Sequence, residues 1–183
     1  MTDLAVLLPI VAFIALAAGL AVVLRGTGRI VARTREVESF RRAVADLAYR
    51  VDASLDGAAG QIDAVRRHTM PADAIADTLA AATDAVERYA AEAEALGGPR
   101  RAQTIRTEII HELERAGRAL AMVEHGTAIL VSSRGPRELE AQTSIKRGYL
   151  NLLHAREAIA RHAVEAAELE ADEPKPTSGW RRA

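Results

Sequence analysis

The feature that most constrains this chain is an uncharged apolar run over residues 4–24. It contains no Asp, Glu, Lys or Arg, and a helix needs about 20 such residues to cross the hydrocarbon core of a bilayer. We therefore predict a single transmembrane helix, with residues 1–28 forming the anchor and its junction. The run is longer than the apolar part of a cleavable signal sequence. Because Ala15-Leu16-Ala17 has the small residues of a cleavage site, removal as a signal stays open as the alternative.

Basic residues on one side of the apolar run predict its orientation. Arg25, Arg29 and Arg33 follow it, whereas no Lys or Arg precedes it. Such residues stay on the cytoplasmic side of a membrane and lie near its interface. We therefore expect a single-pass protein of the cell membrane, with its amino end outside and the rest of the chain in the cytoplasm.

The carboxyl end carries a second group of residues suited to a membrane interface. Residues 173–183 are predicted to be a disordered tail that contains Trp180, Arg181 and Arg182. Trp favours the interface, and Arg is attracted to anionic headgroups. Two interpretations stay open, a weak second contact with lipid and a tail that touches nothing.

Between these ends, residues 29–172 show helical periodicity throughout. Apolar residues recur at steps of three and four, as in amphipathic helices, and no segment shows the period-two alternation of a strand. Pro and Gly at the breaks predict helices over about 30–68, 71–96, 100–132 and 136–172. Since short loops make consecutive helices antiparallel neighbours, we predict an all-α fold, an antiparallel four-helix bundle of coiled-coil type. An extended array of coiled-coil hairpins is the alternative.

The predicted core follows directly from these four apolar stripes. Its members are Val37, Phe40, Val44, Leu47, Val51, Leu55, Ala58, Ile62, Val65; Ile75, Leu79, Ala82, Val86, Tyr89, Ala93, Leu96; Ile105, Ile109, Leu113, Ala116, Leu120, Val123, Thr127, Leu130; and Leu139, Gln142, Ile145, Tyr149, Leu152, Ala155, Ile159, Ala163, Ala166, Leu169. Gly26 and Gly28 predict a hinge or a frayed junction after the anchor, since glycine weakens a helix. Gly57 and Gly60 indicate either a close helix crossing or a bend.

Composition narrows the classes of function. The formal net charge is −1 and aromatic residues make up 3% of the chain, so it lacks the basic surface and stacking platforms of nucleic-acid binders. Without cysteine it has no thiolate ligand or cysteine nucleophile. No phosphate-binding loop or hydrolase motif is present either. We expect no cofactor, no nucleic-acid partner and no enzymatic activity.

One pair of residues has the spacing of metal ligands. Glu108 and His111 form a Glu-x-x-His pair, which in carboxylate-bridged bundles occurs twice and with further glutamates. Because only one such pair occurs here, metal binding is the less favoured interpretation. The alternative is that Glu108 and Glu112 pair with Lys146 or Arg147 of the next helix and thereby set the register of the bundle.

Two apolar segments are candidates for contact with a partner. Tyr149, Leu150 and Leu153 widen the stripe of the fourth helix, which indicates either a second core face or a partner contact. Residues 128–131 are apolar on every side and form either the end of the core or an exposed tip for a partner.

The features together predict a membrane-anchored helical bundle that serves as an interaction or scaffolding module. Its partners would be membrane lipid and either further copies of itself or a helical protein. A signalling bundle that passes movement of the anchor to a cytoplasmic partner is one alternative. An enzyme with a metal held by carboxylates and histidines is the other, and the less favoured.

Overall fold

The computed structural model describes residues 3–132 and 137–170, with side chains at Phe13, Leu16 and from residue 32 onwards. Its elements are α1 (Asp3–Arg66), the 3-10 turn η1 (Ala72–Ile75), α2 (Ala76–Ala95), α3 (Ala102–Ser132) and α4 (Glu138–Ala167). No strand occurs in these ranges. The all-α prediction is confirmed. The chain divides into two units, Met1–Glu38 with Glu170–Ala183, and Ser39–Leu169, which we call the bundle unit.

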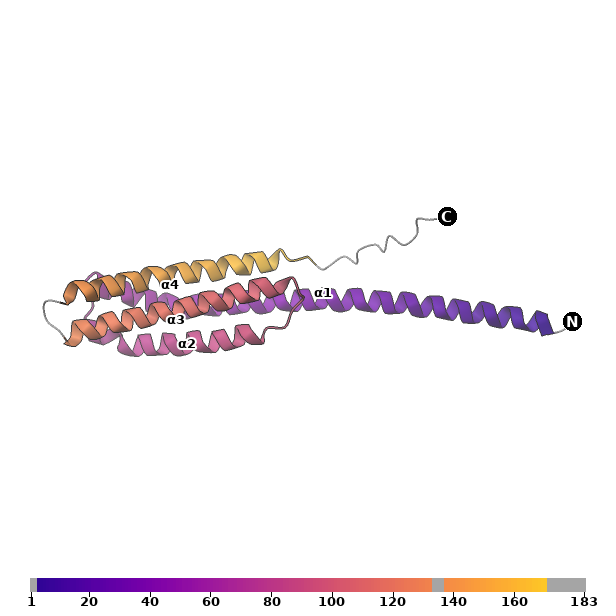
Figure 1. Ribbon diagram of the computed structural model, residues 1–183, viewed down its shortest axis with the longest axis horizontal. Helices are drawn as coiled ribbons and strands as arrows, with labels where there is room; N and C mark the ends of the chain where they lie inside the picture. The colour runs from indigo at the N-terminus through magenta and orange to yellow at the C-terminus, as the bar shows by residue number, and fades with distance from the viewer. Residues whose placement is uncertain (1–2, 133–136, 171–183) are drawn as a thin grey trace. The chain divides into compact units, whose positions relative to one another are not determined.

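Side-chain contacts define the order of helices in the bundle unit. Tyr89 of α2 hydrogen-bonds Ser54 of α1, and Thr78 of α2 donates to Gln61 farther along α1. Arg156 of α4 reaches Asp52 on α1, and Ser144 of α4 donates to the carbonyl of Met122 on α3. Between α1 and α2 one residue number falls as the other rises, so these helices are antiparallel. The same holds for α3 and α4, where Gly126 lies beside Ile145 and Gly148 beside Ala119. Helices α2, α3, α4 and the carboxyl-terminal half of α1 run side by side, which confirms the predicted helical bundle (Figure 1).

The predicted stripes form one continuous core. Helix α2 adds Leu79, Val86 and Ala93 to this core. The largest fully buried side chains come from α1, η1, α3 and α4: Phe40, Val44, Leu47, Leu55, Ile62, Ile75, Ile109, Leu113, Leu120, Ile145, Leu152 and Ile159. Leu139 was wrongly placed among them, since it is 80% exposed. Ala141 is buried in its place. Leu139 lies six residues before Ile145, which turns it about a third of a turn away from the core face. Ala141 lies four residues before Ile145 and is nearly in phase with it.

Helix α1 differs from expectation at its glycines. It continues without a break through Gly26 and Gly28, so the predicted hinge is absent. A glycine costs a helix only about 1 kcal/mol, which a long helix can absorb. At Gly57 and Gly60 an added Cβ would meet nothing within 4 Å, so neither residue marks a close crossing. Helix α4 ends at Ala167, before the predicted residue 172.

None of the helices in the part of the chain that the structure describes is both long enough and apolar enough to cross a membrane. The structure therefore does not support the transmembrane helix predicted over residues 4–24, which stays a prediction from the sequence.

The end of α1 is closed by a backbone motif that glycine normally serves. The amide of Thr69 donates to the carbonyl of Ala64 and that of His68 to Val65, which is the Schellman arrangement. His68 adopts a φ of 59°, the left-handed conformation that costs a residue with a Cβ about 1 kcal/mol or more. The turn therefore stores strain that a glycine would relieve.

We expect His68→Gly to raise the free energy of unfolding by about 0.5–1 kcal/mol, because glycine adopts this φ without strain. Thermal unfolding of the full chain, followed by circular dichroism, measures the change. His68→Ala is the control, since alanine also carries a Cβ and should give no gain. Equal gains in both variants would show that the imidazole, not the backbone, is the source of the strain.

Candidate interaction surfaces

Three large apolar side chains lie exposed along the outer face of α4. Leu139, Leu150 and Val164 are 80%, 44% and 60% exposed. Their separations of about three and four helical turns place them on one side of the helix. Lys146, on the same side, is also exposed. We call Leu139, Leu150 and Val164 the α4 stripe.

The three residues of the predicted partner contact on α4 differ in how exposed they are. Leu150 is exposed, whereas Tyr149 and Leu153 are partly buried and pack against the core. The guanidinium of Arg66 on α1 lies 5.4 Å from the centre of the Tyr149 ring, a cation–π distance. Of the three, only Leu150 is therefore exposed, and its use by a partner stays a prediction.

Two glycines that were not among the predicted core residues determine how α4 meets α3. A Cβ on Gly148 would lie 2.6 Å from the carbonyl oxygen of Ala119 and 2.6 Å from Val123. A Cβ on Gly126 would lie 2.7 Å from Ile145. Both glycines occupy core-facing positions, in register with the apolar residues three or four away. That register was the available signal for a close approach of the two backbones.

An arginine on α4 ties that helix to α1. The guanidinium of Arg156 donates to Asp52 at 2.7 Å and to Asp56 at 3.0 Å, and its side chain is only 15% exposed. Desolvation would lower the pKa of Arg156, but the hydrogen bonds with the two carboxylates outweigh it and raise that pKa above its ordinary value. The fork fixes the register of α4 on α1.

We expect Arg156→Gln to lower the free energy of unfolding by about 1–2 kcal/mol, because it removes two charge-assisted hydrogen bonds from a largely buried side chain. Urea denaturation of the full chain measures the loss. Arg161→Gln is the matched control: Arg161 pairs with Glu157 on its own helix and is 61% exposed, so its loss should stay below about 0.5 kcal/mol. Equal losses would contradict a special role for the fork.

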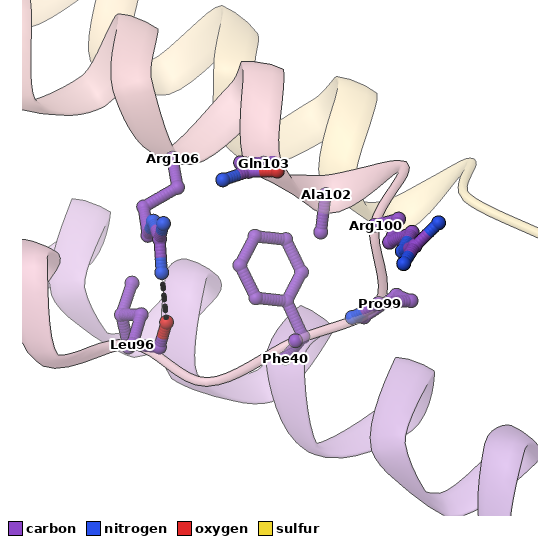
Figure 2. Close-up of a pocket in the computed structure, with 8 residues that line it drawn as sticks. Phe40, Leu96, Pro99, Arg100, Ala102, Gln103 and Arg106 are labelled. Atoms are coloured by element: carbon purple, nitrogen blue, oxygen red, sulfur yellow. Dashed lines mark hydrogen bonds between the residues drawn. The ribbon is translucent and has the colours of Figure 1, made fainter.

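A small cavity lies where the α2–α3 connection crosses α1 (Figure 2). Its volume is about 150 Å³, and its wall includes Phe40, Leu96, Pro99 and Arg106. The ring of Phe40 is 1% exposed and lies under the connection, while Arg106 donates to the carbonyl of Leu96 at 3.1 Å. Ligand pockets usually measure about 300–1,000 Å³. The cavity is better explained as a gap left where the α2–α3 connection packs on α1 than as a binding site.

The predicted metal pair lies on the solvent side of α3. Glu108 and His111 are both exposed, and Nδ1 of His111 is 4.0 Å from a carboxylate oxygen of Glu114. Within the described residues, no group of three or more His, Cys, Asp or Glu side chains is arranged to hold a metal ion. The structure therefore brings no further ligand to this pair.

The predicted pairing of Glu112 with Lys146 or Arg147 is wrong. Glu112 is 7% exposed and pairs with Arg115 of its own helix at 3.0 Å. The antiparallel register explains the error, because Gly148 lies beside Ala119 and Val123. Lys146 and Arg147 are therefore about three turns of helix away from Glu112.

The predicted membrane-interface residues fall mostly beyond the described side chains. Arg33 is described and exposed. The side chains of Arg25 and Arg29 lie outside the described part, as do Trp180, Arg181 and Arg182 and the whole predicted tail 173–183. Their roles stay predictions.

The geometry defines a class, the antiparallel four-helix bundle in which every helix contributes to one core. Comparison of the chain with known protein families, curated proteins and solved structures finds no match. The surfaces themselves therefore carry the functional argument.

Proposed function

We propose that this protein is a membrane-anchored helical bundle that serves as an interaction or scaffolding module. The observation that carries the proposal is the α4 stripe, which exposes Leu139, Leu150 and Val164 along one side of a helix. Aligned apolar side chains on an exposed helix are typical of contacts with another helix. The partner would be a helical protein or a second copy of the chain.

Charged residues within the α4 stripe support the same proposal. Glu157 and Arg161 lie between Leu150 and Val164 and form an ion pair at 3.3 Å. In packed helices, charged residues along the contact select the partner and its direction more than they add affinity. The outer face of α4 thus has apolar side chains that can contact a partner and charged side chains that can select it.

Crosslinking of the full chain in cell membranes with a carboxylate-reactive reagent, followed by mass spectrometry, tests the contact. We expect crosslinks from α4 to one reproducible partner or to a second copy. Leu150→Lys with Val164→Lys should reduce their yield at least tenfold, because the apolar contact is replaced by two charges. Tyr49→Lys is the control, since Tyr49 is 74% exposed on α1. Unchanged α4 crosslinks in the double variant would contradict the proposal.

The anchor is the second part of the proposal and rests on the uncharged sequence of residues 4–24. We expect Phe13→Arg with Leu16→Arg to release the protein from membranes. Each arginine at the centre of a spanning helix costs about 2.5–3.5 kcal/mol in insertion. The measurement is the fraction of protein that stays in the membrane pellet after alkaline carbonate extraction.

The control for the anchor variant adds the same charge elsewhere. Ala45→Arg with Tyr49→Arg alters exposed positions of the bundle unit and should leave the pelleted fraction unchanged. If both double variants stay in the pellet, or if the unaltered chain is already extracted, residues 4–24 do not anchor the protein.

A further inference from the structure

Two adjoining hollows lie at the end of the bundle unit where α1 turns into η1. The first, of about 430 Å³, is lined in part by Val65, Met70 and Leu130. The second, of about 410 Å³, lies between the start of α2 and the end of α3. Ala72 lines both. We call the two hollows together the tip groove.

The apolar part of the second hollow is built largely from small residues. Ala72, Ala76 and Ala128 line the second hollow together with Leu79. Val131 stands at its edge and is 60% exposed. Because alanine leaves room that a larger side chain would fill, the groove can receive an apolar side chain from outside.

The charged groups of the second hollow have one sign. They are Asp73, in the first turn of η1, and Glu124, on α3. Both residues are exposed, and neither carboxylate forms an ion pair with another described residue. A basic group seated beside the apolar surface would find two carboxylates available, and a rim of like charge would repel an acidic group.

We propose that the tip groove binds a helical segment of a protein partner that presents an apolar side chain next to a Lys or Arg. The apolar side chain would fill the second hollow against Leu79 and Val131, and the basic group would pair with Asp73 and Glu124. This inference rests on the proposed function, because it gives the interaction module a second contact, at the tip, and states the chemistry of the partner.

The test uses the full chain in membranes, with a photoreactive amino acid in place of Val131. The probe is a synthetic 18-residue amphipathic helix with a leucine stripe and lysines at its polar positions, and its twin carries glutamates instead. The readout is the peptide concentration that gives half-maximal photocrosslinking. Since the lysine peptide also binds anionic lipid, the concentration used is that of the free peptide left in solution after the membranes are pelleted.

We expect the lysine peptide to reach half-maximal labelling at a concentration at least tenfold lower than its glutamate twin. Asp73→Lys with Glu124→Lys should abolish that difference. Asp73→Asn with Glu124→Gln should reduce it about threefold, which guards against a folding defect in the stronger variant. The control is Asp84→Lys with Glu87→Lys, exposed α2 positions that do not line the groove. It changes the net charge equally and should leave the difference intact.

Three results would overturn the inference. They are equal labelling by the two peptides, a loss of preference as large in the Asp84 and Glu87 control, and labelling from a probe at exposed Tyr49 as strong as from position 131. Crosslinks at the α4 stripe report separately on the proposed function. If they persist and respond to Leu150→Lys with Val164→Lys while the tip shows no preference, the groove proposal fails and the proposed function stands.

Discussion

Gly148→Ala is expected to lower the free energy of unfolding by about 2–3 kcal/mol and the midpoint of thermal unfolding by about 4–12 °C. The added methyl would lie 2.6 Å from the carbonyl oxygen of Ala119 and 2.6 Å from Cγ2 of Val123. The valine can rotate only within a packed core, and the carbonyl belongs to the backbone of α3. The helices must therefore separate, which loosens the contacts of Ile145 and Leu152 as well.

The control for this prediction is a glycine with free space around it. At Gly57 and Gly60 an added Cβ would meet nothing within 4 Å. Alanine is a better helix former than glycine, so each Gly→Ala change there should raise the free energy of unfolding by about 0.5–1 kcal/mol. Urea denaturation of the full chain measures all three variants. A gain for Gly148→Ala, equal to that at Gly57, would show that α3 and α4 do not approach closely.

Phe40→Ala is expected to cost about 3–5 kcal/mol, because it empties a fully buried aromatic site. The ring is 1% exposed, and Gly98 lies against it so closely that a Cβ there would be 2.7 Å from the ring. Its loss would also deprive the α2–α3 connection of the surface on which it rests. Proteolysis between Leu96 and Arg101 should therefore become faster. A variant that destabilises another part of the core equally should accelerate this cleavage less.

Two variants separate packing at Phe40 from the loss of an aromatic ring as such. Phe40→Leu retains most of the volume and should cost about 1–1.5 kcal/mol. Tyr49→Ala removes a ring that is 74% exposed and should change the free energy of unfolding by less than about 0.5 kcal/mol. If Phe40→Ala and Tyr49→Ala lowered the free energy of unfolding by similar amounts, the ring of Phe40 would not be packed in the core.

Helical periodicity predicted most of the fold because amphipathicity is a local property. Every member of the first stripe, from Val37 to Val65, is buried. The prediction that Leu139 is buried was wrong because its position was set by the spacing from Gln142, which is only partly buried. The spacing from Ile145 would have placed it outside the core. At the end of a helix few turns remain to define the phase, so one neighbour decides the assignment.

The candidate surfaces could be predicted only in part. Leu150 was identified from a widened stripe, but the same stripe included Tyr149 and Leu153, which pack against the core. Which flank of a broad apolar stripe turns inward depends on the helices beside it. The apolar segment 128–131 was recognised as an end of the core or an exposed tip, and the structure contains both, with Ile129 at 4% and Val131 at 60% exposure.

By itself, the sequence determined that residues 37–169 form a series of amphipathic helices and which residues make up most of their core, because helix formation and burial follow from side-chain spacing along one chain segment. Only the tertiary structure decided the register between helices. That register keeps Lys146 and Arg147 away from Glu112, places Gly148 against Ala119, and leaves the tip groove between η1 and α3. The reason is physical: each of these depends on the approach of two backbones distant in sequence, and the closeness of that approach is set by the packing of all four helices at once.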